Sequence, residues 1–420
     1  MVNSATPVTR RAVLKTGGAT AVSATALAGC STTSSTGGSS KGPILIGATI
    51  PKTGPLSSTG RSMLRGYKIG IDYINSNGGI DGREVKLIIK DDEGDPKKTR
   101  SKLQQIVSNN DVALLWGSFS SLLVTAGSAF AENQELPFLG STFAYMKPHE
   151  QKNYEWTFAP FPKSRDIARN TKLWFDSLGP NSPTRLAIWE LNTAWGQEMA
   201  DYWAQTFEGT KYDVVFRETY SVGTSDFTTL ISQTKAKDID ALLSNPIPPD
   251  GITAVKQMAS QNFSPKLVDF VRASDPRAWT SALGKMGNYV GSSGVGWLAG
   301  LDTTGTDALV ERYHQQEDVE AGTVPIDVLG DAFGLTQVAA QALQSAGSTT
   351  NTDIKDALLQ ATFDTVLGKF GFTDTGMPEP GQLVPACGQW SDGAPMLVYP
   401  QTDGEYAMET VYPVPDFGSQ

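Results

Sequence analysis

Cysteine and histidine are almost absent from this 420-residue sequence, which contains two of each. Two cysteines cannot form the disulfide framework that staples many small secreted domains. Cys387 lies between Pro385 and Gly388, so we predict a small residue in a turn rather than a nucleophile, which would need an adjacent base. His149 and His314 each lie among charged and polar residues, and we expect both on the surface. The sequence therefore argues against zinc sites and histidine-based catalytic triads.

Clusters of basic residues are also missing. The 44 Asp and Glu outnumber the 34 Lys and Arg. Binding to nucleic acid depends on counterion release by clustered Lys and Arg, so we predict no nucleic-acid partner. The sequence has no GxxxxGK[ST] phosphate loop and no paired carboxylates at catalytic spacing, and it indicates no cofactor. The acidic run DDEGDP (91–96) lacks the further ligands of a calcium loop, and we interpret it as a solvated turn without a metal. An enzyme is not predicted.

Long hydrophobic runs are lacking too, and the one weakly apolar stretch near the start is only about 12 residues long, too short to span a bilayer as a helix. It follows Arg10, Arg11 and Lys15, which is the layout of a signal peptide over residues 1–29. The pair Arg10-Arg11 resembles a twin-arginine export signal.

The four residues LAGC, which end at Cys30, resemble the lipobox of prokaryotic lipoproteins. That resemblance implies a thioether link between Cys30 and diacylglycerol, with the cysteine as the new N-terminus. Residues 30–42 would then be a lipidated cysteine and a flexible Ser/Thr/Gly tether. The expected location is extracytoplasmic, anchored to the cell membrane without spanning it. The alternative is a disordered tail with an accidental cysteine.

Beyond residue 43, short apolar β-branched runs alternate with segments of helical periodicity. A parallel α/β architecture with helices on both faces of each sheet is therefore predicted. Nine strands and seven helices fall into two series, one before and one after residue 162. The predicted strands are 44–50, 84–92, 112–117, 136–140, 185–191, 212–220, 241–245, 266–271 and 289–296. The predicted helices are 60–77, 96–107, one from 121, 195–207, 226–236, 251–260 and 275–284.

In such sheets, ligands bind beyond the carboxyl ends of the strands, where helix N-termini present free N–H groups. The loops at these ends are rich in Ser and Thr hydroxyls, Gly and aromatic residues. They are 51–62, 117–122 and 140–146 in the first series, and 191–196, 221–226, 245–250 and 271–275 in the second. We therefore expect a small-molecule site that draws on both series.

Four stretches of the sequence carry a resemblance to a known family. The first is IGATIPKTGPLSSTGRSMLRGYKIGIDYINSNGGIDGREVKLIIKDDEGDP. The others are WGSFSSLLVTAGSAFAENQELPFLGSTF, AWGQEMADYW and YSVGTSDFTTLISQTKAKDIDALL. These stretches resemble the substrate-binding proteins of ABC transporters, in the leucine/isoleucine/valine-binding branch. The resemblance covers about residues 44–372 and leaves the rest of the chain less clear.

This resemblance implies the type I periplasmic-binding fold, in which two doubly wound parallel-sheet lobes are joined by a three-strand hinge and close on a ligand. Lobe 1 would comprise residues 43–160 plus 297–370, and lobe 2 residues 161–292 plus 382–420. The hinge crossovers would lie near 158–162, 290–299 and 368–382.

The resemblance also implies site residues. A serine after the third strand holds the ligand carboxylate in the family, which here is Ser120 or Ser121, although either residue could simply cap a helix. The loop after the fourth strand supplies N–H groups and a Thr hydroxyl. Here Ala144 stands at the expected hydroxyl position, so either Thr142 substitutes or the ligand differs. Trp195, before Gly196, matches a stacking aromatic; the alternative is a helix face shared with Trp203.

Amino-acid binders of the family carry a carboxylate after the LVDFV strand, whereas this sequence has Arg272 there. A buried ammonium without a counter-ion is costly, while an Arg binds a carboxylate well. Arg272 could instead pair with Asp275 at the surface. Trp297 is a further candidate contact for an apolar or aromatic ligand body, and it could equally be a hinge-packing residue. The remaining candidates come from the same loops and are Thr59, Phe143 and Asn245.

The expected function is capture of a small carboxylate or amide with an apolar or aromatic body, and its delivery to the permease subunits of an ABC importer. The alternatives are a branched-chain amino-acid binder for the same transporter class and a ligand-sensing receptor module of the same fold.

Overall fold

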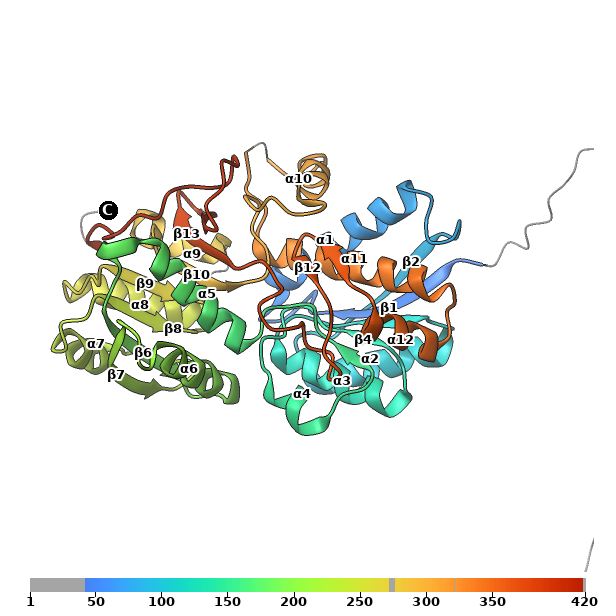
Figure 1. Ribbon diagram of the computed structural model, residues 1–420, viewed down its shortest axis with the longest axis horizontal. Coiled ribbons are helices and arrows are strands. Elements are labelled where there is room, and N and C mark those ends of the chain that lie inside the picture. Colours follow the sequence, from blue (N-terminus) through green and yellow to red (C-terminus); the bar gives the residue numbers. More distant parts are fainter. Residues whose placement is uncertain (1–41, 272–275, 321, 418–420) are drawn as a thin grey trace, which may run out of the picture. The chain divides into compact units, whose positions relative to one another are not determined.

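The computed structural model describes residues 42–271, 276–320 and 322–417 (Figure 1). Strands and helices alternate along most of this chain, as the sequence predicts. β6 has the predicted bounds, and Asp95 caps α2 with Pro96 as the first helical residue, because the Asp95 carboxylate accepts the N–H groups of Lys97 and Lys98. The parallel α/β fold class is confirmed.

The first sheet has five strands, all parallel, in the order β2-β1-β3-β4-β5. They are β1 (Ile44–Ile50), β2 (Val85–Asp91), β3 (Leu114–Trp116), β4 (Phe138–Leu139) and β5 (Thr157–Phe158). The intervening helices are α1 (Ser57–Ser76), α2 (Pro96–Asn109), α3 (Ser121–Gln134) and α4 (Lys147–Lys152). β1, β3 and β4 are almost wholly buried, which explains their continuous apolar sequence.

The second sheet has seven strands in the order β14-β13-β10-β9-β8-β6-β7. They are β6 (Arg185–Leu191), β7 (Asp213–Tyr220), β8 (Ala241–Ser244), β9 (Leu267–Phe270), β10 (Gly291–Val295), β13 (Ala386–Ser391) and β14 (Ala394–Tyr399). β6 to β10 are parallel, whereas β13 and β14 add an antiparallel hairpin at one edge. The helices α5 (Ser164–Ser177) and η1 (Gly179–Asn181) precede this sheet. The helices between its strands are α6 (Ala194–Phe207), α7 (Thr228–Lys235), α8 (Pro248–Ser260), α9 (Pro276–Leu283) and η2 (Gly284–Gly287).

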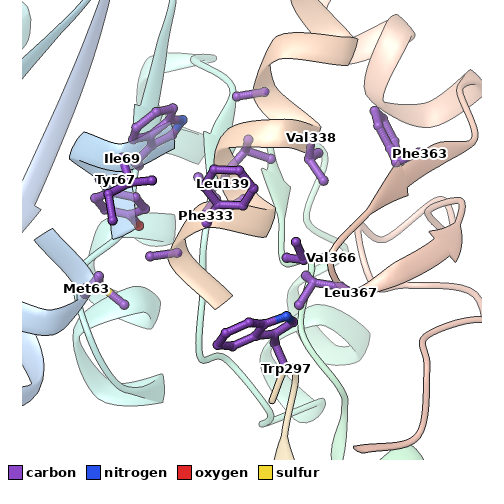
Figure 2. Close-up of a cluster of buried hydrophobic side chains, with 14 of the residues drawn as sticks. Met63, Tyr67, Ile69, Leu139, Trp297, Phe333, Val338, Phe363, Val366 and Leu367 are labelled. Atoms are coloured by element: carbon purple, nitrogen blue, oxygen red, sulfur yellow. The ribbon is translucent and has the colours of Figure 1, made fainter. Parts of the chain in front are cut away.

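The remaining elements follow β10. They are α10 (Thr306–His314), α11 (Asp327–Ala346), α12 (Asn351–Gln360) and the small hairpin β11 (Phe363–Thr365) and β12 (Gly368–Phe370). α11 packs closely on α1. A Cβ added at Gly70 of α1 would lie only 2.0 Å from the hydroxyl of Thr336 in α11, so the contact requires glycine there. Residues of both helices share one hydrophobic cluster with the first sheet (Figure 2).

Some details of the sequence interpretation are wrong. Cys387 is not in a turn but is fully buried in β13, whose antiparallel pairing the local sequence does not reveal. His149 is not on the surface but is fully buried, and half-buried His314 contacts the Tyr406 hydroxyl. The acidic run 91–96 is not wholly solvated either, since Asp92 is buried and accepts a hydrogen bond from the Gly94 N–H.

Candidate functional site

Two strained residues mark the carboxyl edge of the first sheet. Ser120, after β3, has φ 81° and ψ 150°, a region that almost only glycine occupies, and the β-branched Thr142, after β4, has φ 56°. The two are joined, because the Ser120 N–H donates to the Thr142 Oγ1 at 3.1 Å. Strain of this kind costs about 1–3 kcal/mol per residue and persists where the surroundings or a function require it.

The predicted hydroxyl residues therefore lie at the carboxyl edge of the first sheet, close to the N-termini of α1 and α3. Ser120 is the N-cap of α3 and makes no side-chain capping bond, so the capping interpretation does not account for it. Ser121 is the first residue of α3 and is half-buried. Thr59 lies half-buried in the first turn of α1, whose N-terminus also has no side-chain cap.

The β4–α4 loop uses its backbone within the protein. Phe143 and Ala144 are fully buried, and their carbonyls accept the Lys163 Nζ at 2.6 Å and the Ser164 N–H at 3.0 Å. The Phe143 ring belongs to a core cluster and lies under Lys163, with Nζ 4.8 Å from the ring centroid. The Phe143 ring therefore packs as a core side chain in this structure, and its contact with a ligand stays a prediction.

Trp195 is only partly buried and sits in the first turn of α6. Thr193 caps this helix by accepting the Gly196 N–H, and a Cβ at Gly196 would lie 1.9 Å from the Leu191 carbonyl oxygen. The turn thus needs glycine after Trp195. The Trp195 indole donates to the Ser164 hydroxyl at 3.2 Å, whereas Trp203 is fully buried, so the two tryptophans differ in exposure.

Asn245 follows β8 at the carboxyl edge of the second sheet. Its side chain is buried, yet among the described residues neither its oxygen nor its nitrogen has a hydrogen-bond partner. Ser141, at the edge of the first sheet, is likewise buried with a hydroxyl that lacks a partner there. An unsatisfied buried polar group costs about 1–3 kcal/mol, so each is a candidate contact for a bound polar molecule.

Sequence reasoning missed a polar cluster beside these loops. Lys163 is fully buried, and its burial lowers the pKa of the ammonium to about 7. Burial of the His149 ring, together with the charge of Lys163, lowers the pKa of His149 well below its usual range. Burial also raises the pKa of Glu198. The residues that contact Lys163, His149 and Glu198 are distant in the sequence. The sequence around each of the three therefore gives no signal that they form a cluster.

Trp297 lies just beyond the end of β10. It is fully buried in the cluster around the first sheet, near Val366 and Leu367, and its indole donates to the Thr306 hydroxyl (Figure 2). A Cβ at Gly330 would lie 2.0 Å from its ring. The Trp297 ring therefore packs as the alternative describes, and its contact with a ligand stays a prediction.

The remaining predicted residues lie outside the described part of the chain. They are Arg272, Cys30, Arg10 and Arg11. Within the described part, no group of three His, Cys, Asp or Glu is placed to hold a metal ion. Also within it, no helix has both the length and the apolar character needed to cross a bilayer.

The periplasmic binding protein family model matches residues 43–384 of this sequence. The chain belongs to the periplasmic binding protein family. The Leu/Ile/Val-binding protein homolog 1 of Brucella suis biovar 1 (strain 1330) is 26% identical over 384 residues, which cover 88% of this chain and 94% of the relative.

Solved structures of this fold are also similar. A branched-chain amino acid transporter substrate binding protein from Streptococcus pneumoniae, in complex with isoleucine, has a TM-score of 0.71 at 18% identity, covering 84% of this chain and 97% of the other. An ABC transporter solute binding protein from R. palustris, in complex with benzoate, has a TM-score of 0.69 at 17% identity, covering 87% and 99%. Membership of this family makes the chain an extracytoplasmic solute-binding protein rather than an enzyme.

Proposed function

We propose that this protein captures one small molecule between two lobes and delivers it to the permease subunits of an ABC importer. The observation that carries the proposal is the family match together with unsatisfied or strained polar residues at the carboxyl edges of both sheets. Similar proteins are described as components of such transporters. No step of the proposed function changes a covalent bond, because capture needs only contacts that stabilise the closed state.

The proposed lobes are residues 43–160 plus 297–370 and residues 161–292 plus 382–420. Supporting this division, the chain leaves the first sheet after β5 and enters the second with β6. After β10 it contributes Trp297 and Leu298 to the cluster around the first sheet, and it returns to the second sheet with β13. The proposed hinge segments, near 158–162, 290–299 and 368–382, are these three connections.

The proposed ligand site comprises Ser120, Ser121, Thr142 and Thr59 of the first lobe and Trp195, Asn245 and Arg272 of the second. Hydroxyl, amide and guanidinium groups suit a carboxylate or amide, and Trp195 suits an apolar or aromatic body. Two described carboxylates near these loops are engaged: Glu198 accepts from the Met146 and Lys147 N–H groups, and Asp250 accepts from the Gly223 N–H. That arrangement favours a ligand without an ammonium group over an amino acid.

Calorimetry with three probes tests this choice. Benzoate carries an aromatic body and a carboxylate, benzamide replaces the charge by a neutral amide, and isoleucine adds an ammonium. We expect benzoate or benzamide to bind more tightly than isoleucine, and Trp195→Ala to weaken the better ligand. Tighter binding of isoleucine would instead support the amino-acid alternative.

We also propose that the protein is a lipoprotein, exported by a twin-arginine signal and anchored through Cys30. The supporting observation is the order of features in the first 42 residues, a basic patch, a weakly apolar stretch, LAGC and a Ser/Thr/Gly tether. Incorporation of radiolabelled palmitate should be lost in Cys30→Ala and retained in Cys387→Ala, whose thiol is buried. Equal labelling of Cys30→Ala would refute the anchor. Arg10→Lys with Arg11→Lys should block export.

A further inference from the structure

The loop that connects β4 to α4 is held by side chains from two helices of the other sheet. Its residues Phe143 to Lys147 follow Thr142, a proposed ligand contact, and the side chains that hold it come from the start of α5 and the first half of α6. The Phe143 carbonyl accepts the Lys163 Nζ at 2.6 Å, the Ala144 carbonyl accepts the Ser164 N–H at 3.0 Å, and Glu198 accepts the Met146 and Lys147 N–H groups at 2.8 and 3.1 Å.

Ser164 connects this loop to Trp195. Its hydroxyl donates to the Glu198 Oε1 at 2.7 Å and accepts the Trp195 indole N–H at 3.2 Å. Glu198 lies one turn after Trp195 on α6 and uses both of its oxygens, Oε1 for Met146 and Ser164, and Oε2 for Lys147. A single carboxylate thus links the loop of the first sheet to the helix that carries the partly buried Trp195.

Lys163 holds the other end of the loop. His149 donates from Nδ1 to the Thr375 carbonyl at 2.7 Å, which leaves its Nε2 as an acceptor 3.4 Å from the Lys163 Nζ. The Lys163 ammonium therefore spans the Phe143 carbonyl and His149, and it is fully buried. Its backbone N–H donates to the Asp166 carboxylate at the start of α5.

We propose that Lys163, Ser164 and Glu198 are positioning residues that hold the Phe143–Lys147 loop against the helix bearing Trp195, so that the ligand surface is assembled before a ligand arrives. This inference rests on the proposed function only for its consequence, which is tighter binding. A loop that is already ordered loses less conformational freedom when the ligand binds, and affinity rises accordingly.

The charged groups around this assembly make it sensitive to pH. Lys163 faces His149 of α4, Arg165 and Asp166 of α5 and Glu198 of α6. Glu198 is close to Lys147 as well. Three donors point at the Glu198 carboxyl, so a proton on it would compete with them and release the loop at low pH.

Hydrogen exchange of the full mature chain without ligand tests the proposal. Glu198→Gln keeps the size of the side chain but turns one acceptor oxygen into a donor, which then faces an N–H group. We expect the Met146 and Lys147 amides to exchange about tenfold faster or more. The matched control is Glu208→Gln at the exposed far end of α6, where exchange should stay at the wild-type rate.

A pH series separates positioning from general destabilisation. The exchange rate of the Met146 amide is first corrected for the intrinsic pH dependence of exchange. In the wild type this rate should increase on acidification, whereas in Glu198→Gln it should be high at every pH. The β6 amides should stay protected in both proteins. If Glu198→Gln fails to fold, Ser164→Ala, which retains the carboxylate, should give a smaller acceleration. Unchanged protection in Glu198→Gln, or in Ser164→Ala if that variant is needed, would overturn the proposal. Because no ligand is used, this outcome is independent of whether benzoate or isoleucine binds.

Discussion

At the scale of single residues, the candidate site is defined by polar groups whose bonding is incomplete or whose backbone is strained. The family resemblance implied Ser120, Thr142 and Trp195, and the strand-end rule predicted the loops that contain these three residues and Asn245. It could not tell that the Phe143 ring points into the core. An aromatic residue in a loop has the same sequence signature in either orientation.

The first prediction concerns Asn245. Asn245→Leu removes two buried polar atoms that have no partner within the described part of the chain, and it keeps a side chain of similar size. We therefore expect the free energy of unfolding to rise by about 1–2 kcal/mol. The same change should weaken the binding of the best of the three probes by about tenfold or more, because a ligand contact is lost. Urea denaturation and calorimetry measure the two effects. Unchanged affinity would remove Asn245 from the site. Exposed Asn109→Leu is the control.

The second prediction concerns Asp269, which is fully buried in β9 and accepts hydrogen bonds from the Ser293 hydroxyl and N–H. Burial raises its pKa to about 6. Between pH 4 and 6 the folded state therefore binds more protons than the unfolded state, and the contribution of Asp269 to stability is lost as pH rises through this window. The shift corresponds to roughly 3 kcal/mol.

Asp269→Asn should remove this dependence. The stability of the wild type relative to the variant, from urea denaturation, should fall as pH rises from 4 to 7. The exposed Asp302→Asn should follow the wild-type profile. Parallel profiles for wild type and Asp269→Asn would contradict the assignment.

At the scale of elements, periodicity predicted the β-α alternation well and the final third of the chain poorly. The strand 185–191 and the Asp95 cap depend on local sequence, so they could be predicted. The β13–β14 hairpin is antiparallel at the edge of a mainly parallel sheet, and it joins that sheet through the pairing of β13 with β10, a strand far earlier in the chain. Lys163 and Glu198 were missed for the same reason, since their partners are other segments.

The third prediction concerns the contact between α1 and α11. Gly70→Ala would gain up to about 1 kcal/mol of helix propensity, but its Cβ would lie 2.0 Å from the Thr336 hydroxyl. We expect a net loss of about 1–3 kcal/mol, because a packed interior resists added volume. The urea midpoint should fall with an unchanged slope. Lys68→Ala, exposed on the same helix, should have little effect, and a stabilised Gly70→Ala would contradict the close packing.

At the scale of the whole molecule, the account rests on two parallel sheets whose carboxyl edges supply one ligand site. The alternation of strands and helices and the family could be predicted from the sequence, because apolar runs alternate with helical periodicity and a long, specific motif runs from β1 to α2. The ligand could not be predicted in the same way, because ligand choice depends on the direction of individual side chains, including that of Arg272. At about 26% identity to a relative, the ligand has to be inferred from the site residues of this chain itself.

Capture of a small molecule is the central claim, and a thermal-shift assay on the purified mature protein tests it most directly. Fractions of a small-molecule extract from the source cells serve as the ligands. A ligand at 100 times its Kd stabilises the folded state by about 2.7 kcal/mol, so at least one fraction should raise Tm by several degrees. The shift should disappear in a Trp195→Ala, Asn245→Ala double variant that unfolds cooperatively. No shift from any fraction, or an equal shift in the double variant, would contradict the account.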